Sequence, residues 1–347
     1  MHKEIICLGN SPPPYSGRNI CFIMLFDKLK KINFENITLH KIDLTKANNK
    51  TKLIFYIYKY FSYLKLYNFL IFSKKEMEII ISSNSSFGLL FDIILIIICN
   101  KKNYKSYIHH HNFSLLNKNL LNSIFFFISK KSYHIFLSKT VKKSFQSQYK
   151  MPNTLCLNNA YTINLKLNKK GTLNKTIGFM SNLTEAKGVL VFLELVNHKM
   201  LRKFNFLLGG TCDDKQILKR INECQKYKNF KYYGEITNNE NKENFYNQID
   251  LFLFPSKYKN ETQPLVILEA MSLNIPVLSS NIGAISDIIN NENLLINDIN
   301  DISQWKKKIN QIFFNYDYYE KIIKEEFLKL KKLNFHEFNK LIQKINE

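Results

Sequence analysis

The sequence predicts an α/β fold made of two tandem domains, each built around a parallel sheet. Short strand-like runs alternate with longer helical stretches along the chain. At 347 residues the chain is longer than a single hydrophobic core usually supports, which favours two domains. Its 45% of hydrophobic residues are enough to form a core in each. Strand–helix alternation of this kind implies parallel strands with helices on both faces of each sheet.

The first domain is predicted to span residues 1–165. Its expected strands are 4–8, 37–44, 78–83, 105–111, 132–137 and 154–157. Its expected helices, which are amphipathic or apolar, include 53–72, 87–99, 115–130 and 139–149. The polar, irregular stretch Asn164–Lys175 then predicts a linker.

The second domain is predicted to span residues 172–318 and repeats the same rhythm. Its expected strands are 176–180, 204–208, 230–233, 251–255 and 276–279. Its expected helices are 187–199, 214–227, 240–248, 264–273 and 284–290. Residues 319–347, rich in Lys and Glu, predict a closing helical segment that packs back on the first domain. Because ligands of open α/β sheets bind beyond the carboxyl ends of the strands, site residues are expected in the loops just after strands.

Charge divides the chain unevenly. Residues 1–170 carry 26 Lys+Arg and 7 Asp+Glu, a net charge of +19, whereas residues 171–347 carry 24 and 21, a net charge of +3. A coding bias toward lysine would colour both halves alike. The basic half therefore indicates an anionic partner, for which a membrane surface, a lipid-pyrophosphate acceptor and nucleic acid each fit. A solvated lysine-rich surface is the plain structural alternative.

Cysteine usage and hydropathy favour a cytoplasmic protein. The six cysteines are scattered, without CxxC pairs, and are typical of reduced core thiols. The chain enters its first strand without a signal-peptide pattern, and its most apolar run, 87–99, is too short to span a bilayer. We expect a soluble protein or one that lies on the inner face of the cytoplasmic membrane.

The segment from Asp250 to Asn274 carries two acidic residues in informative places. Between Pro264 and Leu273 every residue is apolar except Glu269 and Ser272, which predicts a buried helix. A carboxylate at position 269 then needs partners, either an Arg or backbone group of the protein or the hydroxyls of a ligand. Glu261 lies just before the helix N-terminus, where the backbone N–H groups and the helix dipole favour a negative charge. It is either an ordinary capping acid or part of a binding site.

The spacing Glu261-x7-Glu269, followed by Ala-Met, a turn, Ile-Pro-Val-Leu-Ser-Ser and Gly283, resembles the donor-binding signature of family-4 retaining glycosyltransferases. The resemblance implies the GT-B fold, two Rossmann-like domains facing a cleft. It also implies that Glu261 contacts the donor sugar and that Glu269 binds the ribose. The intervening residues, Gln263 and Leu265 included, would present backbone N–H groups to the sugar and phosphates. Where the family usually has Phe-Gly this chain has Gln263-Pro264, so one backbone donor is lost.

Two glycine-containing loops extend the resemblance. Residues 177–188 look like the strand, loop and helix that open the family's second domain, where an Arg and a Lys clamp the donor pyrophosphate. Lys187 stands at the Lys position, but Asn182 stands at the Arg position. Near the N-terminus, residues 9–18 resemble the family's Pro-rich, Gly-Gly loop. This assigns Gly17 and Arg18 to the donor phosphate.

Three consecutive histidines form the end of the predicted strand 105–111. Alternation along a strand places His109 and His111 on one face and the middle histidine on the other, which is poor geometry for a single metal ion. The family commonly has a His at the end of this strand, pointing at the donor sugar. The resemblance therefore assigns His109 to catalysis with Glu261, and His111 to donor binding. Partly buried structural histidines are the alternative.

Together these features predict a retaining transferase that moves a sugar from a UDP- or GDP-linked donor, without a cofactor or a bound metal. The expected acceptor is a glycan or a lipid-linked glycan of bacterial-type surface polysaccharide or glycolipid synthesis, with peripheral contact to an anionic membrane. A non-catalytic GT-B subunit and a nucleic-acid-binding protein remain as alternatives. A GT-B epimerase or phosphorylase is disfavoured by the spacing of the two acids.

Overall fold

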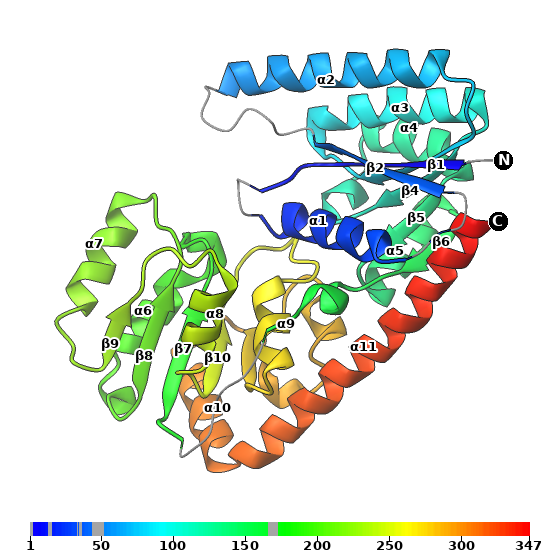
Figure 1. Ribbon diagram of the computed structural model, residues 1–347. Helices are drawn as coiled ribbons and strands as arrows, with labels where there is room; N and C mark the ends of the chain where they lie inside the picture. Colours follow the sequence, from blue (N-terminus) through cyan, green and yellow to red (C-terminus); the bar gives the residue numbers. More distant parts are fainter. Residues whose placement is uncertain (1–2, 13–15, 33, 35–36, 44–51, 166–172) are drawn as a thin grey trace. The chain divides into compact units, whose positions relative to one another are not determined.

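The computed structural model describes residues 3–12, 16–32, 34, 37–43, 52–165 and 173–347. The chain divides into two compact units. Unit 1 comprises residues 1–162 and 334–347, and unit 2 comprises residues 163–333. Each unit is an α/β structure with a parallel sheet between helices (Figure 1). The predicted fold class is therefore confirmed.

The sheet of unit 1 has six parallel strands in the order β2-β1-β3-β4-β5-β6. The strands are β1 (Lys3–Gly9), β2 (Ile37–Asp43), β3 (Met77–Ser82), β4 (Lys105–His109), β5 (Tyr133–Phe136) and β6 (Thr154–Cys156). The strand order reverses direction between β1 and β3. Open α/β sheets place their ligands at such a point.

The helices of unit 1 largely follow the prediction. They are α1 (Gly17–Lys30), α2 (Lys52–Phe72), α3 (Leu89–Lys102), α4 (Leu120–Ile128) and α5 (Lys139–Tyr149). The predicted single helix over 115–130 is wrong, because α4 is separated from a preceding 3-10 turn (Phe113–Leu116). Asn119 caps α4 by accepting a hydrogen bond from the Asn122 N–H, and the Asn122 amide donates to the Asn117 carbonyl at 2.8 Å. These local side-chain bonds compete with a continuous helix.

One face of this sheet is covered by α1 and by the end of the last helix, α11 (Tyr316–Asn346). Phe338, Leu341 and Ile345 pack with Phe22 and Leu25 in a single buried cluster. The Lys3 ammonium and the Tyr107 hydroxyl donate to the carbonyls of residues 345 and 344, each at 2.9 Å. Because the last carbonyls of a helix have no partners within it, these two donors fasten the end of α11.

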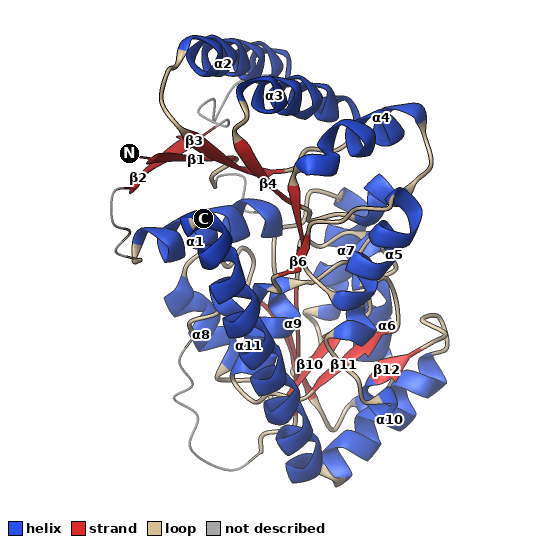
Figure 2. Cartoon of the chain, turned by 90° about the vertical axis from the view of Figure 1, so that its right-hand side faces the viewer, coloured by secondary structure: helices blue, strands red, loops and turns tan. Residues whose placement is uncertain are grey.

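The other face of the same sheet carries α2, α3 and α4, which lie side by side in Figures 1 and 2. Of the aromatic residues of α2, Tyr63 and Tyr67 are buried, whereas Tyr58, Tyr60 and Phe61 are exposed. The Tyr56 side chain lies outside the described part of the structure. Among the described residues, none of the helices combines the length and the apolar character that a bilayer-spanning segment requires.

Unit 2 repeats the architecture with the strand order β12-β11-β10-β7-β8-β9, again parallel. The strands are β7 (Thr176–Met180), β8 (Asn205–Gly209), β9 (Phe230–Tyr232), β10 (Leu251–Phe254), β11 (Val277–Ser280) and β12 (Leu295–Ile296). This is the Rossmann order, with its reversal between β7 and β10. The sequence analysis missed β12, which at two residues is too short to show a pattern.

The helices of unit 2 are α6 (Val189–Asn197), α7 (Lys215–Cys224), α8 (Asn239–Tyr246), α9 (Leu265–Ser272) and α10 (Ile302–Phe314), followed by the first part of α11. The predicted helix 284–290 is wrong, because only a 3-10 turn forms there (Ile285–Asp287). The N–H groups of Asn290 and Asn291 donate to the Glu326 carboxylate at 2.9 and 3.1 Å instead of to carbonyls of a helix. The apolar spacing of this segment arises because Ile285, Ile288 and Ile289 are buried, and not because the segment is a helix.

Candidate functional site

In unit 2 the loops that follow β7 and β10 meet where the strand order reverses. The Lys257 N–H donates to the Ala186 carbonyl at 2.8 Å and joins the two loops. Gly188 has φ +81°, and a Cβ there would lie 1.7 Å from the Pro255 carbonyl oxygen. Only glycine permits this approach. The two loops that the sequence analysis singled out are thus held together by their backbones.

Glu261 lies in the second of these loops with its side chain nearly buried. Its Oε1 accepts hydrogen bonds from the Lys187 ammonium and from the Ser256 hydroxyl, the latter at 2.9 Å. Its carbonyl accepts from the Ala284 N–H at 2.9 Å. Gly283, at φ +62°, comes so close that a Cβ would lie 2.0 Å from that carbonyl oxygen. Glu261 and Lys187, predicted from separate motifs, are therefore direct partners.

Glu269 lies on α9 and is 5% exposed. Its Oε1 accepts from the Lys242 ammonium at 2.6 Å and its Oε2 from the Tyr246 hydroxyl at 2.9 Å. Both donors come from one side of α8. The buried carboxylate therefore has partners within the protein, a lysine and a tyrosine instead of an arginine or backbone. The sequence analysis missed both, although their spacing of four residues places them on one helix face.

The remaining predicted residues of unit 2 lie around this pair of acids. Asn182, at the position of the family's arginine, is exposed in the loop after β7 and has the Thr211 hydroxyl 3.5 Å from its Oδ1. Gln263 is buried beside Glu261 in the loop before α9. The helix begins at Leu265, one residue later than predicted, and Pro264 is its N-cap. Pro264 has no polar side chain, so the N-cap residue itself makes no capping hydrogen bond to the first N–H groups of α9.

In unit 1, Gly17 and Arg18 begin α1 beside the reversal between β1 and β3. Gly17 has open space around the position of a Cβ, so no contact within the described chain requires a glycine there, and its role toward the donor phosphate stays a prediction. Arg18 donates from Nη1 to the Ser83 carbonyl at 3.1 Å. This bond ties the first turn of α1 to the loop after β3.

A buried polar network that the sequence analysis missed lies at the same edge of the sheet. Asp92 is fully buried and accepts from the Asn84 N–H and Nδ2, both at 2.7 Å, and from the Tyr63 hydroxyl at 3.3 Å. The buried Lys59 ammonium donates to the Asn84 Oδ1 at 2.9 Å. Burial raises the pKa of Asp92 to about 6, against the opposing effects of the Asn84 hydrogen bonds and of the Lys59 and Arg18 charges.

The three histidines divide as alternation predicts, although β4 already ends at His109. The rings of His109 and His111 lie 4.1 Å apart, whereas the ring of His110 stacks on Phe136 on the other side. The Nε2 of His110 lies 2.9 Å from the Nδ1 of His134. His110 and His134 are thus structural members of an aromatic core.

His109 is 1% exposed, and its Nε2 has no hydrogen-bond partner among the described residues. Burial lowers its pKa to about 3, so the imidazole is neutral at physiological pH. His111 is partly exposed, and its pKa is lowered chiefly by burial and also by the neighbouring His109 and Arg18. A neutral buried imidazole with an unused nitrogen suits contact with a hydroxyl group.

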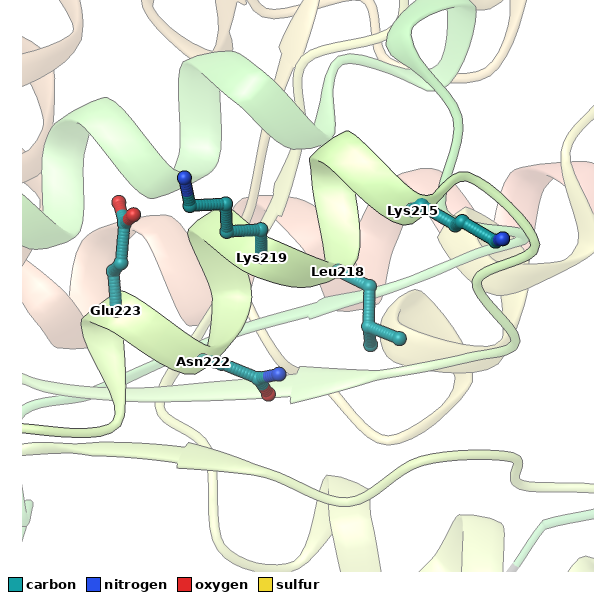
Figure 3. A pocket seen from close by; sticks show the side chains of 5 residues that line it. All are labelled: Lys215, Leu218, Lys219, Asn222 and Glu223. Carbon is teal, nitrogen blue, oxygen red and sulfur yellow. The ribbon is translucent and has the colours of Figure 1, made fainter.

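A shallow hollow on the surface of unit 2 lies elsewhere (Figure 3). Its lining side chains, Lys215, Leu218, Lys219, Asn222 and Glu223, all belong to α7. None of the residues described above takes part. A depression lined by one exposed helix offers no converging groups, and we assign no site to it.

Comparison with known proteins follows the same division of the chain. Residues 164–327 match the family model described as Glycosyl transferases group 1. The O-antigen biosynthesis glycosyltransferase WbnH of Escherichia coli is 26% identical over 274 residues, which cover 76% of this chain and 75% of the relative.

Two solved structures share the fold over nearly the whole chain. HepE of Anabaena, in complex with UDP and glucose, has a TM-score of 0.70 at 14% identity and covers 98% of this chain and 99% of that one. Sucrose-phosphate synthase of Thermosynechococcus elongatus has a TM-score of 0.71 at 14% identity, with 99% of each chain covered. From the match of residues 164–327 to this family model, the similarity to WbnH and the shared GT-B fold, the chain is a glycosyltransferase.

Proposed function

We propose that the chain is a family-4 transferase that moves a sugar from a nucleotide diphosphate donor with retention at the anomeric carbon. The donor is UDP- or GDP-linked, and no cofactor or resident metal takes part. The observation that carries the proposal is the pairing of two nearly buried acids, Glu261 and Glu269, each with a lysine, at the strand-order reversal of unit 2. A nucleotide at this place would meet carboxylates for its hydroxyls and cations for its phosphates.

Each group receives one role in this proposal. Glu269 accepts hydrogen bonds from the ribose hydroxyls, held in place by Lys242 and Tyr246. Lys187 binds the diphosphate and offsets the charge that grows on the leaving nucleotide. The N–H groups in the first turn of α9, whose N-cap is Pro264, supply further donors to the phosphates. They and Lys187 would do the work of the arginine that Asn182 replaces.

Donor binding would exchange the partner of Lys187. The Lys187 ammonium donates to Glu261 in the structure. A diphosphate carries more negative charge than a carboxylate and would draw the lysine away. Glu261, still held by Ser256, then has a lone pair for a hydroxyl of the donor sugar. In this exchange each group has a partner of opposite charge both before and after the donor binds.

His109 and Glu261 are the residues that we assign to catalysis. The unused Nε2 of His109 contacts a hydroxyl or ring oxygen of the sugar near the reacting carbon, and His111 and Arg18 assist from the same unit. Removal of a preorganised polar contact of this kind lowers turnover more than substrate binding.

The acceptor class follows from charge and from the relatives. The first half of the chain, at +19, suits an anionic acceptor such as a lipid-linked glycan, and WbnH is named for O-antigen biosynthesis. We therefore propose a step in surface polysaccharide or glycolipid synthesis, carried out at an anionic membrane.

Ligand-induced thermal stabilisation tests the donor site. UDP, GDP, ADP and CDP are compared on the native chain, on Glu269→Ala and on Glu240→Ala, a matched control that removes an exposed carboxylate of α8. A ligand at 100 times its dissociation constant stabilises by about 2.7 kcal/mol. We expect one nucleotide to stabilise the native chain and the control, and Glu269→Ala to lose that shift. No shift with any nucleotide at millimolar concentration would overturn the donor assignment.

Measurements of turnover test the retaining mechanism and the independence from metal ions. With the identified donor and an acceptor, NMR of the product gives the anomeric configuration, and inversion contradicts the retaining mechanism. The reaction is repeated after removal of divalent cations with a chelator. Loss of activity that Mg²⁺ or Mn²⁺ restores would contradict the proposal that no metal takes part.

A further inference from the structure

The solvent-facing side of the layer formed by α2, α3 and α4 is apolar to an unusual extent. On α3 the exposed residues at helical spacing are Leu90, Ile94 and Ile97. On α4 they are Leu120, Ile124 and Phe127. The outward stripe of a helix in a soluble domain is normally polar. Two neighbouring helices of this layer therefore present continuous apolar stripes.

The third helix, α2, adds aromatic rings to the same face of the unit. Phe61, Phe69 and Phe72 are exposed, Phe72 to 79%. Phe87, just before α3, is exposed to 86%. Because α2 packs on α3 and α3 on α4, the three helices form one layer on this face of the sheet (Figures 1 and 2). The exposed side chains of the three helices therefore belong to the solvent-facing side of one layer. Contiguous apolar surface on this scale marks an interaction site.

Charge on this layer has one sign. The described side chains of the three helices include one carboxylate, that of Asp92, and it is fully buried. Lysine pairs occur at 74–75, 101–102 and 130–131, directly before β3, β4 and β5. Since these strands are parallel neighbours, the three pairs line up along one edge of the sheet. The apolar surface is thus bordered by cations.

Composition separates the candidate partners. Two copies of this surface joined about a twofold axis would place lysines chiefly against lysines, although the exposed Glu76 lies beside the first pair. Protein interfaces are also depleted in lysine. A bilayer surface with anionic lipids accepts both features, because aromatic and aliphatic side chains enter the boundary between headgroups and acyl chains and lysines contact the phosphates.

We infer that the exposed surface of α2, α3 and α4 docks on an anionic lipid bilayer by inserting its apolar side chains. This goes beyond adsorption of a basic protein through charge alone. The inference deepens the proposed function and rests on it for the reason why the protein would dock. Docking would hold unit 1 at the surface from which a lipid-linked acceptor is presented.

Sedimentation with vesicles tests the inference on the full chain. Vesicles of phosphatidylcholine alone are compared with vesicles of phosphatidylcholine and phosphatidylglycerol. The variant Phe61→Ser/Phe72→Ser/Phe127→Ser removes three exposed rings of the layer. The control Phe314→Ser/Phe335→Ser removes two equally exposed rings of α10 and α11 (88% and 69%). Because all five side chains are exposed, both variants should fold, which circular dichroism checks.

We expect the native chain and the control to bind the anionic vesicles and the triple variant to bind at least about tenfold more weakly. Added salt should weaken the native binding without abolishing it, because inserted apolar groups are not screened. Unchanged binding of the triple variant, or complete loss of native binding in salt, would overturn insertion.

A further outcome would also overturn the inference, namely a native dimer that the triple variant converts to a monomer, since the surface would then be occupied by a second copy. The nucleotide-induced thermal shift is measured on the same samples. If the triple variant keeps this thermal shift but no longer binds the vesicles, the substitutions have removed docking without affecting the donor site. A native chain that binds vesicles but no nucleotide would contradict the donor site and leave docking standing.

Discussion

The two units place charged residues at the carboxyl ends of their strands in opposite ways. In unit 2 each acid has its own lysine, Lys187 for Glu261 and Lys242 for Glu269, so the charges of these four side chains balance. In unit 1, Arg18 and Lys59 face one buried carboxylate, Asp92, whose pKa burial raises to about 6. Neither cation forms a direct ion pair within the described chain.

The difference suits the two substrates proposed for the units. Paired charges hold side chains in place and can exchange partners when a donor binds, at little cost to the free energy of folding. Cations without direct counterions leave a positive potential that attracts an anionic acceptor. Each of the following substitutions or conditions tests one side of this comparison.

The largest effect is expected from breaking the Lys187–Glu261 pair. Glu261→Gln should lower kcat by about 10²- to 10³-fold, because a contact to the reacting sugar is lost. UDP or GDP binding should be unchanged or tighter, because Lys187 is released toward the phosphates. Lys187→Met should weaken both turnover and binding. If Glu261→Gln weakened nucleotide binding as much as Lys187→Met, the exchange of partners would be wrong.

Removal of the single acid of the unit 1 network should have the next largest effect. Asp92→Ala removes the acceptor of three buried donor contacts, of which only that of Asn84 Nδ2 keeps another acceptor, the Tyr63 hydroxyl, and we expect a loss of about 3 kcal/mol in the free energy of unfolding. Denaturant unfolding measures the loss. Adding Lys59→Met should restore part of it, because the cation that Asp92 offsets is then absent. If the losses of the two single variants simply added in the double variant, the Lys59 cation and the Asp92 carboxylate would not stabilise each other.

Low pH should weaken unit 1 selectively. Burial lowers the pKa of His109 to about 3 and that of His134 to about 4, below the unfolded value of 6.5. The unfolded chain then binds more protons, so stability is complete above pH 6.5 and falls as the pH drops toward 4. At pH 5 each such histidine costs about 2 kcal/mol.

Amide hydrogen exchange against pH, residue by residue, measures this effect. Protection should fall in β4 and β5, while β7 and β10 of unit 2 respond less. The exposed His336 provides the control, since His336→Ala should leave the curve unchanged. Equal loss of protection in both sheets would contradict the assignment to the buried histidines.

The smallest effect is expected at Gly17, which is compared here with Gly188 of the loop after β7. Gly17→Ala meets open space at the start of α1 and should change stability by no more than about 0.5 kcal/mol. Gly188→Ala places a methyl group against the Pro255 carbonyl at positive φ and should destabilise clearly. Thermal unfolding compares them. Equal destabilisation would mean that the loop after β1 is as tightly held as the loop after β7.

Much of the fold was predictable because its signals are local. Strand and helix periodicity placed most elements within a few residues, and the alternation of His109 and His111 followed from strand geometry alone. The errors arose where local patterns compete with distant partners. The segment 284–290 has helical spacing, but Glu326, far along the chain, takes the N–H groups that a helix would have used.

The sequence by itself determined the α/β class, the strand-end positions of the candidate residues and the acidic pair with its resemblance to a donor-binding signature. Only the tertiary structure decided what those residues touch. That Glu261 pairs with Lys187, that Glu269 is held by Lys242 and Tyr246, and that Asp92 collects Asn84 and Tyr63 depends on strand order and helix packing. These contacts join residues far apart in the sequence, and a one-dimensional pattern carries no information about which of many lysines a buried carboxylate will meet.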